Sequence, residues 1–260
     1  MATALVTGAS SGIGEAFARL FAADHYNLVL VARSKEKLDS LKTELEANHG
    51  VSIFLLPLDL SVIDCVSPIQ SYLTRHGIVV DLLINNAGFG AHGSFLETSQ
   101  ETERDMILLN ILTLTELTKF FAKSMVKRGK GHILNVASTA AFFPGPYASV
   151  YYATKAYVLS FSLALSEELR GSGVTITTLC PGATQSNFAD RAGMKNTKLF
   201  GKRNLPTSEE VALFGYKALM AGKRLAIHGW FNRVQITVAR ILPPTLLSRI
   251  VVTVQNIKKQ

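Results

Sequence analysis

Short apolar runs alternate with helix-like stretches along most of the chain, and this alternation constrains the fold more than any other feature. Seven runs have the length of a β-strand and are largely apolar: TALVT, NLVLVA, VSIFLLPL, VDLLIN, HILNVAS, VTITTLC and RLAIHG. Apolar strands separated by helices are typical of a parallel sheet that is buried on both faces. The pattern therefore predicts a mostly parallel sheet of about seven strands.

Helices are expected between these strands, among them a short one over 64–75, a long one over about 150–170, and others near 111–128 and 208–221. Right-handed crossovers then place helices on both faces of the sheet. We predict a doubly wound α/β fold, that is, a Rossmann fold with three αβα layers. The 260 residues contain no internal repeat, linker or low-complexity stretch, so we expect a single domain over 1–260.

The formal net charge of +8 favours anionic partners in general. The basic residues do not form one dense run, and no helix-turn-helix, zinc-finger or RNA-binding pattern is present. We therefore expect no nucleic-acid partner. The six histidines are scattered without ligand spacing, so we predict no metal site.

Cysteine usage and the lack of long apolar runs bear on the compartment. Cys65 and Cys180 lie far apart, whereas a secreted disulfide scaffold would use more cysteines. The first residues show no charged leader with an apolar core, and no apolar run has the length needed to span a bilayer. A cytoplasmic setting is expected, with peripheral contact to a membrane as the alternative.

The tail, residues 231–260, is expected to form a less regular C-terminal extension. It is apolar with interspersed arginines, and Pro243 and Pro244 interrupt it. Such a segment can pack on the core as a helix, form a partner surface or lie on a membrane surface. Packing on the core or on a subunit is favoured over membrane contact.

A glycine-rich turn, VTGASSGIG, follows the first predicted strand and opens the first predicted helix. Its glycines allow a tight turn and a close approach of the backbone to a ligand. The free N–H groups and the positive end of the helix then face a pyrophosphate. In this strand–turn–helix context the pattern predicts a dinucleotide site. Its predicted cofactor-binding residues are Gly8, Ser10, Ser11, Gly12, Ile13 and Gly14.

The end of the second predicted strand, VLVARSKEK, bears on the choice of cofactor. In a dinucleotide fold this position faces the adenosine ribose, where an acidic residue would hold the 2′-hydroxyl of NAD. Arg33 stands there instead, and Lys37 lies one turn further on. Because a guanidinium pairs well with a 2′-phosphate, the sequence predicts NADP(H).

Several short motifs occur in order along the chain, and together they resemble one family. They are TGASSGIG, NNAG, Asn110, Ser138, YYATK and the pair Pro181–Gly182. Over about residues 1–230 the chain resembles the short-chain dehydrogenase/reductase family, in its short-form and NADP-type branch. The segment NNAGFGAHGSF is similar to the broad-specificity reductases of that family. The resemblance implies an oxidoreductase that reduces a ketone or aldehyde with NADPH, or oxidises a secondary alcohol.

The family's catalytic pair is a tyrosine followed four positions later by a lysine, and among the seven tyrosines only Tyr151 has that offset, to Lys155. Residues four apart lie on one helix face. A ketone that receives hydride develops negative charge on oxygen and needs a proton donor there. A nearby ammonium stabilises the phenolate, so Tyr151 is expected as the general acid/base. Tyr152 is expected to pack or to line the substrate cleft.

The resemblance implies further roles. Ser138, at the end of HILNVAS, would hold the substrate oxygen, and Asn110 would support a water-linked proton path to Lys155, which also bonds the nicotinamide ribose. The remaining implied cofactor contacts are Asp59, Leu60, Asn86, Ala87, Gly88, Tyr151, Lys155, Pro181, Gly182 and Thr184.

Residues 185–206 resemble the family's substrate lid, and basic side chains outnumber acidic ones there. The basic residues are Arg191, Lys195, Lys198, Lys202 and Arg203, against the single acid Asp190. This charge suits an anionic or thioester-carrier substrate, although a solvated loop is the favoured interpretation.

Two alternatives to a general carbonyl reductase stay open. One is a non-catalytic NADP-binding regulator, which the presence of Ser138, Tyr151 and Lys155 disfavours because a pure binder needs no acid. The other is a ketoacyl-thioester reductase. A homodimer or homotetramer is expected, because the apolar helices near 111–122 and 153–165 are similar to the family's dimer faces.

Overall fold

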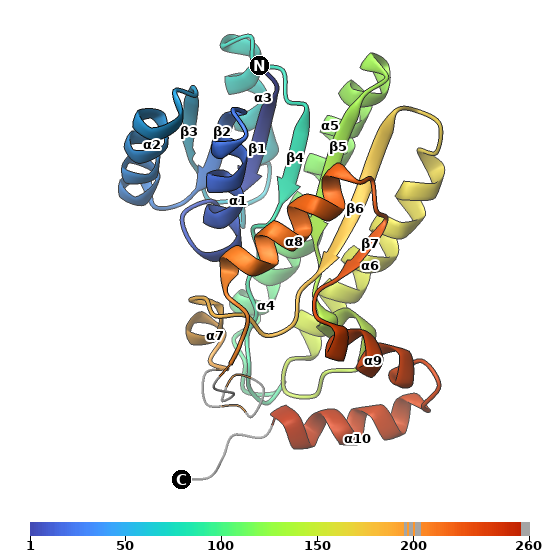
Figure 1. Ribbon diagram of the computed structural model, residues 1–260. Coiled ribbons are helices and arrows are strands. Elements are labelled where there is room, and N and C mark those ends of the chain that lie inside the picture. The colour runs from blue at the N-terminus through green and yellow to red at the C-terminus, as the bar shows by residue number, and fades with distance from the viewer. Residues whose placement is uncertain (195–196, 198–199, 201–203, 256–260) are drawn as a thin grey trace.

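The fold is one seven-stranded sheet with helices on both faces (Figure 1). The computed structural model describes residues 1–194, 197, 200 and 204–255. All strands are parallel, in the order β3-β2-β1-β4-β5-β6-β7. The strands are β1 Thr3–Thr7, β2 Asn27–Ala32, β3 Ile53–Pro57, β4 Leu82–Asn85, β5 Gly131–Val136, β6 Val174–Cys180 and β7 Leu225–Ile227. The predicted doubly wound Rossmann fold is confirmed.

Alternating side chains of the central strands build two separate cores. Leu28 and Leu30 of β2 belong to one core, whereas Val29 and Val31 belong to the other. Successive residues of a strand point to opposite faces, so an apolar residue at every position is what a sheet buried on both sides requires. Helices on the first face are α1 Gly12–Ala23, α2 Lys35–His49 and α8 Ser208–Met220, and those on the second include α3 Val66–Arg75, α5 Leu114–Arg128 and α6 Ser149–Glu168.

The strand order reverses between β1 and β4, because the chain builds outward through β2 and β3 and then returns to the other side of β1. At such a reversal the loops after the two strands run in opposite directions and leave a crevice at the carboxyl ends. The glycine turn follows β1 and the segment NNAG follows β4 at this point. The topology therefore brings the two motifs to one edge of the sheet.

The helix predicted over 111–128 is longer and less regular than expected. Helix α4 Gln100–Ile107, the π-helix η1 Leu108–Thr113 and α5 follow one another directly. The sequence pattern did not predict α4, because this segment is mostly polar and Met106 is its one buried residue. A π-helical turn inside an α-helix often lies at a functional site, and Asn110 lies in this one.

The tail was expected to be less regular, and this expectation was wrong, since two helices follow β7. They are α9 Trp230–Ala239 and α10 Pro244–Gln255, and both lie at the lower end of the molecule in Figure 1. Pro243 lies in the turn between the two helices and Pro244 opens the second, because proline is tolerated in the first helical turn. No helix in the described part of the chain is both long enough and apolar enough to cross a membrane.

Candidate active site

A cavity of about 510 Å³ lies at the carboxyl ends of the strands and contains most of the predicted site. Three of the four predicted catalytic residues line it, namely Ser138, Tyr151 and Lys155. The predicted cofactor-binding residues that line it are Gly8, Ser10, Ser11, Gly12, Ile13, Arg33, Asp59, Leu60, Asn86, Ala87, Gly88, Pro181, Gly182 and Thr184. The fold thus gathers residues from the first 190 positions around one space.

The glycine turn is shaped for close contact. Gly8 and Gly12 adopt φ values of +66° and +62°, which other residues rarely reach. Gly14 is constrained by space instead, since a Cβ there would lie 2.3 Å from the carbonyl oxygen of Gly8. Among the described residues the N-cap Ser11 makes no side-chain capping hydrogen bond, so the first N–H groups of α1 are left for an anion. A pyrophosphate fits this cradle.

Asn86 supports the turn from behind. Its Nδ2 donates to the carbonyl oxygen of Thr7 at 3.0 Å, and its backbone N–H donates to the Thr7 hydroxyl at 3.0 Å. A Cβ on Gly14 would also lie 2.4 Å from this Nδ2. Gly14 and the Asn86 side chain therefore fix the shape of the turn, although Asn86 also lines the cavity.

Arg33 and Asp59 face each other across the outer end of the cavity. The Arg33 Nη1 lies 3.7 Å from the Asp59 Oδ2, and 69% of the Arg33 side chain is exposed. Burial raises the pKa of Asp59, but hydrogen bonds from Ser61 and the charge of Arg33 outweigh it and hold the pKa below its usual value. An ion pair this long and exposed stabilises little, so the guanidinium is available to an anionic ligand.

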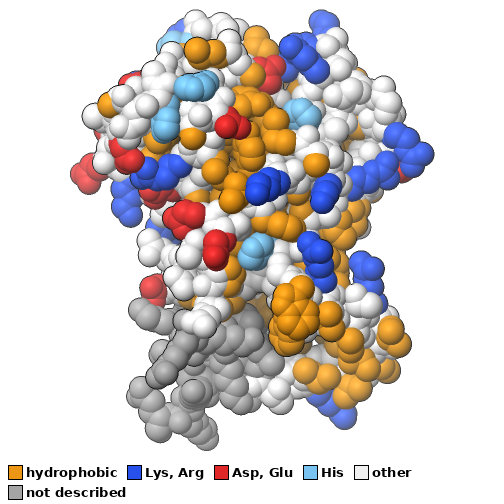
Figure 2. All heavy atoms as spheres, in the orientation of Figure 1, with side chains coloured by type: hydrophobic (Ala, Val, Ile, Leu, Met, Phe, Trp, Pro, Cys, Tyr) orange, Lys and Arg blue, Asp and Glu red, His pale blue; other side chains and the backbone are white. Residues whose placement is uncertain are grey.

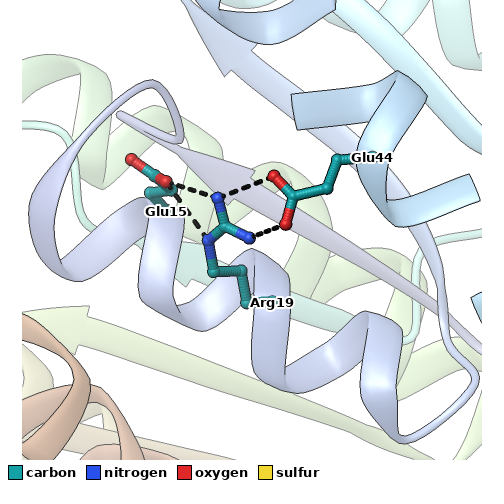
Figure 3. Close-up of polar contacts among 3 residues, drawn as sticks. All are labelled: Glu15, Arg19 and Glu44. Atoms are coloured by element: carbon teal, nitrogen blue, oxygen red, sulfur yellow. Dashed lines mark hydrogen bonds and ion pairs between the residues drawn. The ribbon is translucent and has the colours of Figure 1, made fainter. Parts of the chain in front are cut away.

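Lys37 lies apart from this cavity and lines a second hollow behind the glycine turn. Both hollows share Ser10, Ser11 and Gly12. Three of the residues that line the second hollow are linked to one another: Arg19 of α1 donates to both Glu15 and Glu44 (Figure 3). This network ties α1 to α2.

Tyr151 is buried beside the Ser138 hydroxyl. Burial raises the pKa of the phenol above its usual value, and the hydrogen bond with Ser138 opposes this rise. The phenol is therefore protonated at neutral pH and able to donate a proton. Its ring packs against Phe188 at 5.4 Å between centroids. Ser138 is itself held by the Ala140 N–H, which donates to its Oγ at 3.1 Å.

Lys155 lies one helical turn after Tyr151 on α6 and is also buried. Its Nζ donates to the carbonyl oxygen of Val136 at 2.9 Å and lies 5.9 Å from the centroid of the Tyr151 ring. Burial lowers the pKa of Lys155 to about 8. The sequence predicts that the Lys155 ammonium lowers the pKa of Tyr151. In this structure the ammonium is directed to the carbonyl oxygen of Val136, and burial raises the pKa of Tyr151 instead.

Asn110 lies behind the cavity, where it joins three segments. Its Nδ2 donates to the carbonyl oxygen of Phe89 at 2.9 Å and to the Thr154 hydroxyl at 3.0 Å, and its Oδ1 accepts from the Phe89 N–H. Gly88 separates it from Lys155, since a Cβ on Gly88 would lie 2.9 Å from the Asn110 Oδ1 and 3.4 Å from the Lys155 Nζ. The amide oxygen and the ammonium therefore face one glycine.

The loop after β6 closes the inner side of the cavity. The Thr184 hydroxyl donates to the carbonyl oxygen of Gly182 at 3.0 Å, and the Thr139 N–H donates to the carbonyl oxygen of Pro181 at 2.9 Å. A Cβ on Gly182 would lie 2.5 Å from the Nδ2 of Asn232 on α9. This loop is thus held between the strand ends and the C-terminal helices.

An apolar wall on the far side of Tyr151 was not predicted from the sequence. It comes from the loop before α6, from Phe188, Met194 and Phe200, and from α9 and α10. Its members are Phe143, Phe188, Met194, Phe200, Ile236, Leu247, Ile250 and Val251. A sequence signal for part of this wall is the spacing of Leu247 and Val251, which lie four residues apart, as residues on one helix face do. Both side chains are buried in the structure.

The predicted lid, 185–206, is only partly covered by the structure. It contains the short helix α7 Phe188–Arg191, and Arg191 lines the cavity. Its other predicted basic residues, Lys195, Lys198, Lys202 and Arg203, lie outside the described residues. Among the residues that are described, no three His, Cys, Asp or Glu side chains gather as a metal site.

The glycine turn at the reversal of strand order and the cavity beside it define a dinucleotide-binding protein of the doubly wound class. Residues 2–196 match the short chain dehydrogenase family. The chain therefore belongs to the short-chain dehydrogenase/reductase family.

Relatives of known name agree with this membership. The chain is 36% identical over 200 residues to 17-beta-hydroxysteroid dehydrogenase type 3 of Mus musculus, over 75% of this chain and 64% of that protein. It is 35% identical over 178 residues to very-long-chain 3-oxoacyl-CoA reductase of Pyrenophora tritici-repentis, over 66% of this chain and 52% of that protein. The chain thus spans between half and two thirds of the length of these two relatives.

A solved structure is similar over nearly the whole chain. It is a short-chain dehydrogenase from Sphingobium yanoikuyae in complex with NADPH, 33% identical, with a TM-score of 0.82. The similarity covers 92% of this chain and 94% of that one.

Proposed function

We propose that this protein is an NADP(H)-dependent oxidoreductase that reduces a ketone or aldehyde, or oxidises the corresponding secondary alcohol. The observation that carries the proposal is that Ser138, Tyr151 and Lys155 line the same cavity as the glycine turn. A buried phenol at that place can donate a proton to a substrate, which nucleotide binding alone does not require, and this argues against a non-catalytic regulator.

The nicotinamide nucleotide, when bound, supplies or accepts the hydride. The α1 N-terminus would hold its pyrophosphate, and Pro181, Gly182 and Thr184 would lie at its nicotinamide. Ser138 would hold the carbonyl oxygen of the substrate, and the Tyr151 hydroxyl would donate its proton to that oxygen as charge develops there. The Lys155 ammonium, whose Nζ lies 5.9 Å from the centroid of the Tyr151 ring, would stabilise the resulting phenolate across that distance. Asn110, with its amide oxygen beside Gly88, would pass the replacement proton toward Lys155 through water.

The exposed guanidinium of Arg33 supports a preference for NADP(H) over NAD(H). We expect Arg33→Ala to weaken NADPH binding by about tenfold to a hundredfold, because a charge-assisted bond to a phosphate is lost. NADH binding should barely change, since NADH has no 2′-phosphate. Titration of each nucleotide by fluorescence measures the two affinities.

Lys37→Ala is the matched control for this experiment, because Lys37 lies in the second hollow. Its effect on NADPH should be smaller than that of Arg33→Ala. An equal loss of NADPH and NADH affinity in the Arg33 variant would contradict the assignment of the 2′-phosphate contact.

The apolar wall supports a bulky, apolar substrate. Phe143, Phe188 and Leu247 would surround the part of the substrate beyond the carbonyl. The names of the two relatives, a hydroxysteroid dehydrogenase and a very-long-chain 3-oxoacyl-CoA reductase, point to substrates of that kind. The second relative, together with Arg191 at the cavity, keeps a ketoacyl thioester as the second candidate substrate.

A panel of ketones tests this proposal. We expect kcat/KM for a steroid or aryl ketone to exceed that for acetone by about a hundredfold or more, because each buried methylene contributes about 0.8 kcal/mol. Phe188→Ala should lower kcat/KM for the bulky ketone by about tenfold, while Phe95→Ala, an exposed control outside the cavity, should not. NADPH absorbance gives the rates. Equal rates for acetone and the bulky ketones would contradict an apolar substrate site.

A ketoacyl thioester in the same panel separates the two candidate substrates. Under this proposal residues 1–260 act as a single domain, and residues 185–206 act as a lid over the apolar wall. The predicted homodimer or homotetramer and the predicted cytoplasmic setting stay predictions.

A further inference from the structure

We propose that α9 and α10 dock this protein on an anionic lipid surface, and that the cavity opens beside the docked face. The docking does not depend on the function proposed above. Its use for substrate access does, because it requires the cavity to accept an apolar carbonyl compound.

Helix α9 is apolar on both of its sides. Ile236 and Ala239 are buried against the body of the protein. On the outer side Trp230, Val234, Val238 and Ile241 follow at helical spacing, and Trp230 and Ile241 are 76% and 82% exposed. The outer face of a surface helix is ordinarily polar, so this stripe calls for a partner.

Helix α10 extends the same apolar surface. Leu246 and Ile250 are four apart and exposed, while Leu247 and Val251 are buried toward the cavity. Figure 2 shows apolar side chains gathered at the lower right, over α9 and α10, with lysine and arginine side chains around them. We call the exposed side chains of these two helices the apolar face: Trp230, Phe231, Val234, Val238, Ile241, Leu246 and Ile250.

The charges around the apolar face have one sign. Arg233, Arg240 and Arg249 are exposed on or beside these helices. The Arg233 guanidinium lies over the Phe214 ring and its Nε donates to the carbonyl oxygen of Ile227, and the Arg240 guanidinium lies over the Phe142 ring, so these two are partly engaged with the body of the protein. Residues 211–260 of the sequence contain no Asp or Glu. Arginine stems can lie along an apolar surface while their guanidinium groups reach lipid phosphates. Apolar residues with basic side chains and a tryptophan are the composition of helices that lie in an anionic membrane interface.

A second copy of the chain fits this face less well. In a two-fold interface the same residues meet from both sides, so the arginines of one copy would approach those of the other. Without an acid anywhere in residues 211–260, this segment of the partner has no opposite charge to offer. An anionic lipid surface supplies the missing charge.

The mouth of the cavity adjoins this face. Ile250 and Gln235 both line the cavity, and both are exposed. An apolar compound dissolved in the lipid would therefore meet the cavity wall without crossing water. The same two helices would serve as docking surface and as substrate wall.

Trp230 is the chain's single tryptophan, so it reports on the proposed face directly. The full chain is mixed with vesicles of phosphatidylcholine alone, or of phosphatidylcholine and phosphatidylserine in a three-to-one mixture. We expect a blue shift of the Trp230 emission and quenching by brominated lipid, both much stronger with phosphatidylserine. No change with either vesicle, or an equal response to both, would overturn the proposal. So would a blue shift that rises with protein concentration in the absence of lipid, because it indicates a second copy.

Variants that keep Trp230 test the same face. Val234→Ser with Ile241→Ser should lower the affinity for phosphatidylserine vesicles by about tenfold or more, since two apolar side chains no longer leave water. Ile63→Ser with Leu96→Ser, at exposed positions outside these helices, is the control and should bind as wild type. Arg249→Glu should weaken binding more than Lys127→Glu on α5. Equal losses in the test and control variants would overturn the proposal.

Reduction of a water-soluble ketone should stay unchanged in the Val234 and Ile241 variant. Vesicle binding tests the docking, and reduction of a water-soluble ketone tests the oxidoreductase proposal. The two measurements are independent, so the failure of one proposal is distinguishable from the failure of the other.

Discussion

Tyr151→Phe is expected to lower kcat for carbonyl reduction by about a thousandfold while leaving the affinity for NADPH nearly unchanged. Phenylalanine keeps the ring, so the contact with Phe188 at 5.4 Å between centroids stays. Only the proton donor is lost. The Ser138 hydroxyl still reaches the substrate oxygen, which accounts for a residual rate. NADPH absorbance measures the rate, and a fluorescence titration measures binding.

Tyr152→Phe is the matched control, because Tyr152 is the adjacent residue, lines the same cavity and is equally buried. It also loses one hydroxyl, yet its rate should stay within a few-fold of wild type. If Tyr151→Phe kept a wild-type rate, or if Tyr152→Phe lost as much, the proton donor would have been assigned to the wrong residue.

Lys155→Met is expected to act on stability and activity in opposite directions. Burial lowers the pKa of Lys155 from 10.5 to about 8, so at neutral pH the folded protein holds a charge that water would solvate better. Methionine removes that cost, and we expect the free energy of unfolding at pH 7 to rise by about 1–3 kcal/mol. The loss of the hydrogen bond to Val136 limits the gain. Activity should fall by about a hundredfold or more.

The difference in stability between the wild type and Lys155→Met should depend on pH, and its direction follows from the lowered pKa of Lys155. Between pH 8 and 10.5 the unfolded chain holds the Lys155 proton and the folded protein does not, so the stability of the wild type rises with pH through that window. The full cost of burying the charged Lys155 side chain is present below pH 8, and none of this cost remains above pH 10.5. The Lys155→Met protein lacks this rise, so the two stabilities should converge at high pH.

Denaturant unfolding at several pH values measures the effect. Lys217→Met, at an exposed lysine on α8, is the control and should follow the wild-type profile. A Lys155→Met protein that is less stable than wild type at pH 7, with no convergence at high pH, would show that the buried ammonium is not a cost to folding.

The sheet could be predicted from the sequence because both of its faces are buried. Each strand of a doubly covered sheet is apolar at almost every position, so runs such as NLVLVA stand out without any alignment. Helix α4 could not be found in this way, because it buries one side chain, Met106, and the rest of its pattern is polar. The π-helical turn at Asn110 leaves no trace in a periodicity of 3.6.

The cofactor end of the cavity could be predicted because its residues lie in short motifs with local geometry. The glycine turn and the offset from Tyr151 to Lys155 are each contained within a few residues. The apolar wall could not, because Phe143, Phe188 and Leu247 meet only in the folded chain. Lys37 lies one turn after Arg33 in sequence, yet the glycine turn separates it from the main cavity.

The position of α9 and α10 at the end of the chain, after β7, gives the protein a modular character. The proton-transfer residues lie on elements that end before residue 170, while a large share of the wall comes from helices that begin at Trp230. Ligand preference can therefore diverge among descendants of this chain by exchange of its last two helices, with the chemistry inherited intact. Under the two proposals above, an engineer who replaces these two helices with those of a relative would change the substrate wall and the lipid-docking face in one step.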